Sequence, residues 1–214
     1  MIKSNSWNWN NIEDNFWQEP ADDIYYFLRR WKKEGYSQIL DLGCGIGRHS
    51  ILFSENGFSV TGYDLSESGL NKLNLYAKDK GLQIKTVLGD IRYLPFGNEY
   101  FDCIIAYHSM YHTDTPGMEC VIKEIERVMK KNGEIYASFI SKNTYSYSAP
   151  ECKKVDENVR LKKEEDGNIL PHYFVDYKDI KLLLSNFEII KVKQVEDLWD
   201  GKSSWHYFVH AKNI

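Results

Sequence analysis

The chain has only four cysteines among its 214 residues, and no two of them stand in a Cys-x-x-Cys spacing. Neither a zinc site nor a disulfide framework is therefore indicated, and we predict no metal. Scattered cysteines are typical of reduced thiols, so we expect a cytoplasmic protein. They are Cys44, Cys103, Cys120 and Cys152.

Long apolar runs and blocks of basic charge are also absent. No stretch reaches the roughly 18 apolar residues of a transmembrane helix, and the polar residues 1–11 lack the apolar centre of a signal peptide. The 27 basic and 31 acidic residues give a net charge of −4, and basic residues gather only in pairs such as Lys153 and Lys154. We therefore expect neither a membrane nor a nucleic acid as partner. The oligomeric state is not indicated.

The chain is long enough for one domain with a full core, to which 43% hydrophobic residues contribute. Short apolar runs alternate with helical patterns, which favours an α/β fold: a Rossmann-like sheet of seven strands, mostly parallel, with helices on both faces and the last strand antiparallel. The first of the seven predicted strands begins at residue 39, and the other six cover 58–63, 84–88, 101–107, 134–140, 187–195 and 204–211. The predicted helices include 21–33, 118–129 and 179–185, and we expect Asn132 and Gly133 to end the second of these.

We divide this single domain, residues 1–214, into four segments. Residues 1–35 form an N-terminal helical or lid segment, and 36–141 form a cofactor-binding core. Residues 142–177 are too polar and too long for an ordinary connection, so we expect a cap over the substrate. Residues 178–214 supply a closing helix and a hairpin, with its turn at Asp200 and Gly201.

The most informative motif runs from Ile39 to Ser50 and reads ILDLGCGIGRHS. Its three glycines allow a tight turn and close approach to a ligand, and a helix start just beyond offers unpaired N–H groups. An isolated acid, Asp64, follows the next predicted strand, which suits a ribose diol. A dinucleotide fingerprint would have a further glycine at the position of Arg48, so the motif departs from that pattern.

With Asp41 before the glycines, the run DLGCGIG resembles motif I of the class I S-adenosylmethionine-dependent methyltransferases, of the small-molecule, type 11/25-like kind. The resemblance covers residues 36–140. It implies that the backbone of this motif lies against the methionine part of the cofactor, and that Asp64 binds both ribose hydroxyls. The matching motif residues are Asp41, Gly43, Cys44 and Gly45.

The same resemblance places further residues around the cofactor. It implies that Leu65 flanks the adenine and that Asp90, followed by Ile91, accepts from the adenine amino group. The segment 101–107, which ends at Tyr107, resembles the strand beside the reactive sulfonium. Asp102 opens that segment, so we interpret it as structural.

The acceptor side is less defined, because the sulfonium is already activated and no dedicated catalytic motif is obligatory. His108 and His112 follow the fourth strand and are our acid–base candidates, although His112 could also simply pack the loop. His172 could reach the cleft from the cap, whereas packing is the preferred interpretation for His206.

Two further features each have two interpretations. Arg48 could contact the cofactor carboxylate or a substrate anion, or it could be an exposed helix residue. The N-terminal aromatic side chains could form a lid over the cofactor or could pack as core against the sheet. These are Trp7, Trp9, Phe16 and Trp17.

These observations favour an enzyme that transfers a methyl group from S-adenosylmethionine to a small molecule, leaving S-adenosylhomocysteine. An NAD-dependent oxidoreductase is the alternative enzyme, supported by the sheet and the ribose acid. A non-catalytic S-adenosylmethionine sensor also stays open.

Overall fold

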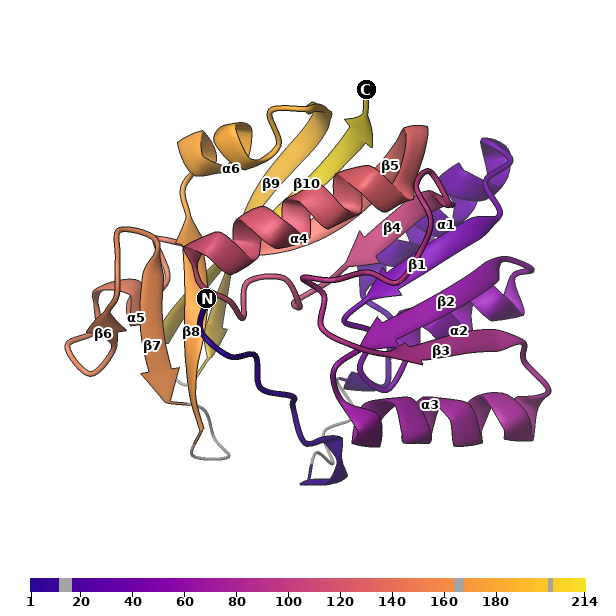
Figure 1. The fold of residues 1–214 in the computed structure, drawn as a ribbon, viewed down its shortest axis with the longest axis horizontal. Helices are drawn as coiled ribbons and strands as arrows, with labels where there is room; N and C mark the ends of the chain where they lie inside the picture. Colours follow the sequence, from indigo (N-terminus) through magenta and orange to yellow (C-terminus); the bar gives the residue numbers. More distant parts are fainter. Residues whose placement is uncertain (12–16, 164–167, 200–201) are drawn as a thin grey trace.

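We describe the fold from a computed structural model of residues 1–11, 17–163, 168–199 and 202–214. One mixed sheet runs through the molecule, with the order β3-β2-β1-β4-β5 on one side (Figure 1). These five strands are parallel. They are β1 (Gln38–Leu42), β2 (Ser59–Asp64), β3 (Ile84–Leu88), β4 (Phe101–Ala106) and β5 (Met129–Ser141).

The hairpin at the end of the chain continues the sheet beyond β5. β10 (Lys202–Asn213) pairs antiparallel with both β5 and β9 (Phe187–Trp199), so the predicted antiparallel last strand is confirmed. The predicted turn at residues 200 and 201 lies outside the described residues. These seven strands correspond to the seven predicted from the sequence.

The predicted cap contains strands that the sequence pattern did not indicate. β8 (Ile169–Val175) extends β5 in parallel, and β7 (Val159–Lys163) and β6 (Lys153–Lys154) follow it as antiparallel neighbours. The short helix α5 (Tyr145–Ser148) lies in the same segment. β6 and β7 carry mainly charged residues and β8 contains Pro171 and His172, so none of the three shows an apolar or alternating pattern, although β8 is buried at six of its seven residues.

The remaining elements are the helices that flank the sheet. They are η1 (Trp9–Asn11), α1 (Asp22–Lys33), α2 (Arg48–Glu55), α3 (Glu67–Lys80), α4 (Thr115–Val128) and α6 (Tyr177–Leu183). The sequence explains their ends: Ser66 caps α3 by accepting from the Gly69 N–H, and the left-handed Gly81 follows its last residue. No described helix has the length and apolar character needed to cross a membrane.

The predicted boundary between the fourth helix and the fifth strand was wrong. We expected Asn132 and Gly133 to end the helix, but α4 ends at Val128 and the chain becomes extended at Met129. Asn132, with φ of 65°, lies inside β5 where the register with β4 shifts. The glycine signal therefore marks an irregularity of the strand and not a helix end.

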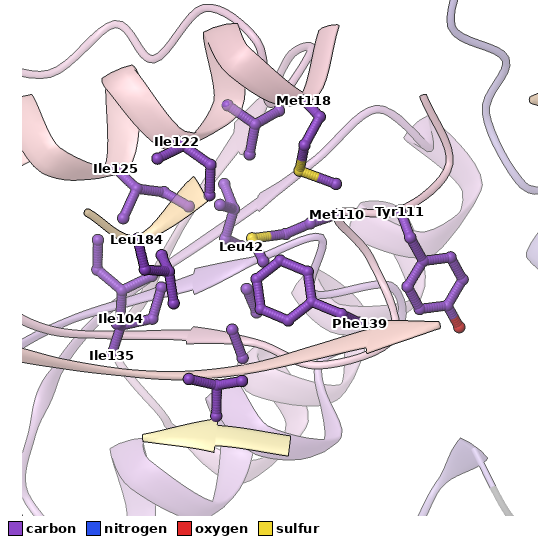
Figure 2. Packing of buried hydrophobic residues seen from close by; sticks show 14 of the residues in the cluster. Leu42, Ile104, Met110, Tyr111, Met118, Ile122, Ile125, Ile135, Phe139 and Leu184 are labelled. Carbon is purple, nitrogen blue, oxygen red and sulfur yellow. The ribbon is translucent and has the colours of Figure 1, made fainter. Parts of the chain in front are cut away.

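Both faces of β1, β2, β4 and most of β5 are buried, and successive residues alternate between these faces, whereas the edge strand β3 has no buried residue. Ile104 contributes to the core under α4, whereas Ile105 contributes to the core under α1 and α2. Figure 2 shows the first core, in which Met118, Ile122 and Ile125 of α4 face the strands. Burial on both faces explains why these strands read as continuous apolar runs.

Candidate active site

The carboxyl ends of the parallel strands border a cavity of about 330 Å³. Open α/β sheets place their ligands at this edge. The sequence-predicted residues that line the cavity are Gly43, Asp64, Leu65, Asp90, Ile91, His108 and His112. The fold therefore gathers residues from four strand ends into one site.

The glycine motif forms the turn that was expected from its sequence. Gly43, Gly45 and Gly47 all have positive φ, at 74°, 56° and 86°. A Cβ on Gly43 would lie 2.2 Å from the Cβ of Ser109, so the close approach of these two loops requires glycine. Ser109 also lines the cavity and donates to the Leu42 carbonyl at 2.6 Å.

Asp64 lies at the end of β2 with its carboxylate held by two backbone N–H groups. Gly45 N–H donates to Oδ2 at 2.8 Å and Ser66 N–H donates to Oδ1 at 2.7 Å. Burial raises the pKa of this carboxyl, although these hydrogen bonds oppose the rise. A half-buried carboxylate at the cavity wall gains from further donors, and a ribose diol would supply two.

Asp90 lines the cavity but already has a strong partner. Arg92 Nη2 lies 2.6 Å from its Oδ2, and Arg92 Nε donates to the same carboxylate. Burial alone would raise the pKa of Asp90, but the hydrogen bonds from Arg92 outweigh it and lower the pKa. Arg92 Nη1 also donates to the carbonyl of Ile2, which links this site to the N-terminal segment.

Asp41 and Cys44 are buried beside the cavity, and neither lines it. Asp41 accepts from the N–H and the hydroxyl of Ser50, at 3.0 and 2.6 Å, and burial raises its pKa to about 6. The Cys44 side chain packs against Leu70 and Leu73. Both side chains therefore support the shape of the glycine turn.

Arg48 and Tyr107 do not line the cavity, contrary to what the sequence suggested for them. The Arg48 guanidinium lies over the rings of Trp17 and Tyr107, 5.1 and 5.4 Å from their centroids, and donates to the Glu19 carbonyl. Because Arg48 opens α2 on the face covered by residues 17–20, its side chain turns toward that segment. It is buried and not exposed, so the surface alternative was also wrong.

The N-terminal segment contributes residues 4–7 and Trp9 to the lining of the cavity, and Figure 1 shows this segment running from beside β8 to α3. The Trp7 carbonyl accepts from Ser66 Oγ at 2.6 Å, and the Trp9 N–H donates to Ser68 Oγ at 3.1 Å. Trp7, Trp9 and Trp17 line the cavity, which favours the lid interpretation of these aromatics. Phe16 lies outside the described residues.

Trp9 fits the glycine motif closely. A Cβ on Gly45 would lie 2.5 Å from its indole ring, and one on Gly69 would lie 2.8 Å from it. The indole Nε1–H is buried without a hydrogen-bond partner among the described residues. A buried donor without a partner is costly, and a ligand oxygen in the cavity would satisfy it.

His108 has a left-handed backbone, with φ of 54°, which is uncommon for a residue other than glycine. Its N–H donates to Ser138 Oγ at 2.6 Å, and its Nδ1 lies 3.1 Å from the Tyr111 hydroxyl. Its ring meets that of His206 edge to face, with centroids 4.6 Å apart. The unusual backbone thus directs the imidazole toward the last strand.

His112 lies beside a second histidine from the cap. The centroids of His112 and His172 are 4.7 Å apart, and burial lowers the pKa of His112 to about 4. His172 and His206 both line the cavity, and His206 is at the same time buried and packed against the rings of His108 and Phe208. The described residues contain no group arranged as a metal site.

Sequence reasoning missed Ser109, Tyr111 and Lys162, which also line the cavity. Tyr111 and Ser109 stand within the loop that carries both histidine candidates, so the loop as a whole was the available signal. Lys162 had no signal, because a lysine in a charged segment resembles an ordinary surface residue. Asp102, by contrast, is structural as predicted: it accepts from the N–H groups of Ser37 and Gln38 at the opposite edge of the sheet.

Comparison with known proteins decides the family. Residues 39–133 match the family model described as a methyltransferase domain. The chain carries a class I methyltransferase domain. The cofactor of this family is S-adenosylmethionine, and the cavity residues fit it: the glycine turn borders the cavity at Gly43, Asp64 offers a carboxylate for the ribose, and Trp9 has a buried donor without a partner among the described residues.

The methyltransferase domain has relatives with several activities. The chain is 28% identical over 175 residues to a sterol 24-C-methyltransferase of Gibberella zeae, covering 79% of this chain and 44% of that protein. The chain spans about half the length of the curated relatives it matches, from 39% to 57% for the first three.

Solved structures show the same fold. An S-adenosylmethionine-dependent methyltransferase of Methanosarcina mazei has a TM-score of 0.74 at 21% identity, covering 92% of this chain and 99% of the other. A Burkholderia thailandensis 1,6-didemethyltoxoflavin-N1-methyltransferase, with its substrate and S-adenosylhomocysteine bound, has a TM-score of 0.65 at 18% identity and covers 90% and 77% of the two chains.

Proposed function

We propose that this chain transfers the methyl group of S-adenosylmethionine to a small-molecule acceptor. The observation that supports this most is the continuity of the cavity, which has Gly43, Asp64 and Leu65 at one end and His108 and His112 at the other. A donor held by the first group would present its methyl group toward the second. The sulfonium supplies its own leaving group, so the protein contributes position and exclusion of water.

The residues of this chain have separable tasks in the proposal. Asp64 holds the ribose, Leu65 and Ile91 flank the adenine, and the glycine turn approaches the methionine part. Asp90, fixed by Arg92, is placed to accept from the adenine. Trp7 and Trp9 cover the site and keep water from it.

We propose the acceptor only as a class, a small molecule. One relative is named for a sterol and one solved structure for 1,6-didemethyltoxoflavin, so small molecules of different kinds are substrates in this family. A cytoplasmic location, suggested by the four free thiols, stays a prediction. The division into a core and a cap within a single domain is likewise our interpretation.

Transfer of label from methyl-labelled S-adenosylmethionine to a metabolite extract tests the proposal. We expect a labelled small molecule. We also expect calorimetry to detect binding of S-adenosylhomocysteine and no binding of NAD. Binding of NAD in place of S-adenosylhomocysteine would support the oxidoreductase. Tight S-adenosylhomocysteine binding without any transfer would leave the sensor.

The histidine candidates are tested separately. His108→Ala or His112→Ala should lower turnover and leave cofactor affinity nearly unchanged, because both side chains lie at the acceptor end of the cavity. Normal turnover in both variants would remove their acid–base role without affecting the assignment of the cofactor site.

A further inference from the structure

We infer that the acceptor is a small, planar compound with an acidic O–H or N–H group, bound as its anion within a cage of histidines opposite the cofactor residues. This inference rests on the proposed function and adds to it the substrate class. The cage consists of His108, His112, His172 and His206, together with Tyr111 and Lys162.

The cage is assembled from segments that are distant in the chain. His108 and His112 follow β4, His172 belongs to β8, and His206 belongs to β10. Tyr111 lies among them, with its centroid 4.6 Å from that of His112 and 5.8 Å from that of His206. Ordinary core packing would place apolar side chains here, since burying four imidazoles is unfavourable without partners.

Two polar atoms of the cage are left for a ligand. Nδ1 of His206 and Nδ1 of His112 are buried without a hydrogen-bond partner among the described residues, and the His206 side chain is only 8% exposed. Native structures rarely leave such atoms unsatisfied. An acceptor with oxygen or nitrogen atoms around its reacting group would satisfy them.

The charges of the cage favour an anion. Burial lowers the pKa of His112 and of His206 to about 4, and the positive charge of Lys162 adds to this effect on both residues. Asp197 of β9 raises the pKa of His206, whereas Arg48 and His49 lower that of His108. The imidazoles are therefore neutral at physiological pH, and Lys162 is the basic residue that lines the cavity beside them.

Weak basicity limits what these histidines can do. A general base works best when its pKa is near the operating pH, so an imidazole with a pKa of about 4 is a poor base for an ordinary alcohol. An acceptor that loses its proton to solvent before binding needs no base. Its lone pair then forms the new bond to the methyl carbon while the C–S bond breaks with its electrons staying on sulfur, and the opposite charges of the two reactants cancel.

The walls of the cage favour a flat and small acceptor. They consist of aromatic and imidazole rings with Ile140 and Leu170, and the Trp7 ring lies 6.4 Å from that of His112. The same cavity of about 330 Å³ has to receive the cofactor as well. A cavity that is shared with the cofactor and walled by planar rings suits one small ring system.

The test measures binding of chromophoric probes to the full chain saturated with S-adenosylhomocysteine. 4-Nitrophenol and 5-nitrouracil are planar acids, and 4-nitroanisole and 1,3-dimethyl-5-nitrouracil, which have no acidic proton, are the matched neutral probes. We expect the acids to bind with the absorption spectrum of their anions, at least about tenfold more tightly than the neutral probes. Binding as the neutral acid, equal binding of the neutral probes, or no binding of either acid would overturn the inference.

Lys162 offers a matched pair of variants. Lys162→Gln should weaken binding of the anions about tenfold, whereas Lys163→Gln should leave it unchanged, because Lys163 is the next residue of β7 and is exposed. His206→Leu should also weaken the anions and should shift the spectrum of the bound probe toward the neutral acid. Equal behaviour of the two lysine variants would contradict the role of Lys162.

The same samples separate this inference from the proposed function. If the unmodified chain does not bind S-adenosylhomocysteine, the cofactor assignment itself is refuted. Normal cofactor binding and methyl transfer to a neutral aliphatic acceptor would refute only the acidic acceptor.

Discussion

Polar clusters of opposite character lie at the two ends of the parallel strands, called here the amino edge and the carboxyl edge of the sheet. At the amino edge Glu134 is bonded by Arg30 at 2.6 Å, by the Trp31 indole at 2.9 Å and by His210 at 2.8 Å. At the carboxyl edge the four histidines leave two nitrogens without partners among the described residues. The first cluster stabilises the fold, and the second retains binding capacity at a cost in stability.

The side chains of Asp102 and His108 show the same contrast. Asp102 at the amino edge accepts from two N–H groups and pairs with Lys130 at 2.7 Å. His108 at the carboxyl edge has a positive φ of 54° and a side chain directed at other polar rings. Strain of this kind persists at sites that bind or react, because the surrounding structure enforces it.

The largest expected effect comes from a substitution at the amino edge. Glu134→Gln should lower the free energy of unfolding by about 3 kcal/mol, because the buried partners lose their countercharge. Urea denaturation measures this change, and the affinity for S-adenosylhomocysteine should stay the same in the folded variant. Glu157→Gln is the control, since its exposed pair with Lys154 should contribute nothing measurable. Equal stability of both variants would contradict the contrast between the edges.

Asp64→Ala tests the carboxyl edge, where the affinity for the ligand should change and not mainly the stability. The affinity for S-adenosylmethionine should fall by about 1 to 3 kcal/mol, because two ribose hydroxyls lose a charged acceptor. Isothermal titration calorimetry measures the change. Since Asp64 also accepts from Gly45 and Ser66, Asp64→Asn serves as a control that keeps an acceptor oxygen. Unchanged affinity in both variants would count against the cofactor site.

The two edges should lose stability in different ranges of pH. Burial lowers the pKa of His112 and His206 to about 4 from 6.5, so the unfolded chain binds more protons and stability falls as the pH drops below 6.5. Burial alone would raise the pKa of Glu134, but Arg30 and His210 lower it further than burial raises it. Its contribution is complete above 4.5, its unfolded value, and is lost at lower pH.

Unfolding free energies measured across this range test both windows. We expect a loss of about 2 kcal/mol for each of His112 and His206 between about pH 7 and about pH 5. His112→Phe together with His206→Phe should flatten this part of the curve, whereas Glu134→Gln should flatten only the part below about pH 4.5. A curve that is level between these pH values in the unmodified chain would show that the cage histidines are not buried neutral.

The smallest expected effect concerns the N-terminal segment. Trp9→Phe should keep the packing on Gly45 and lose the indole N–H, which would weaken cofactor binding by about 0.5 to 1 kcal/mol. Stopped-flow fluorescence should show a faster release of S-adenosylhomocysteine. Trp17→Phe keeps a ring at the cavity wall and is the comparison. Identical release rates in all three proteins would assign Trp9 to packing alone.

Much of the core could be predicted from the sequence because its signals are local. Continuous apolar runs mark strands buried on both faces, and glycines that need positive φ mark the turn after β1. Asp64 follows the second strand directly, so its position at the carboxyl edge follows from the strand order. The motif therefore determined the family and the cofactor end of the cavity.

The tertiary structure alone decided the acceptor end. His172 and His206 come from a cap and a final strand whose pairing with β5 depends on contacts far apart in the chain. The direction of Arg48 was likewise decided by residues 17–20, which no helix pattern reveals. Local sequence determines strands and turns through backbone sterics and burial, whereas side chains that meet across distant segments are brought together only by the packing of the whole sheet.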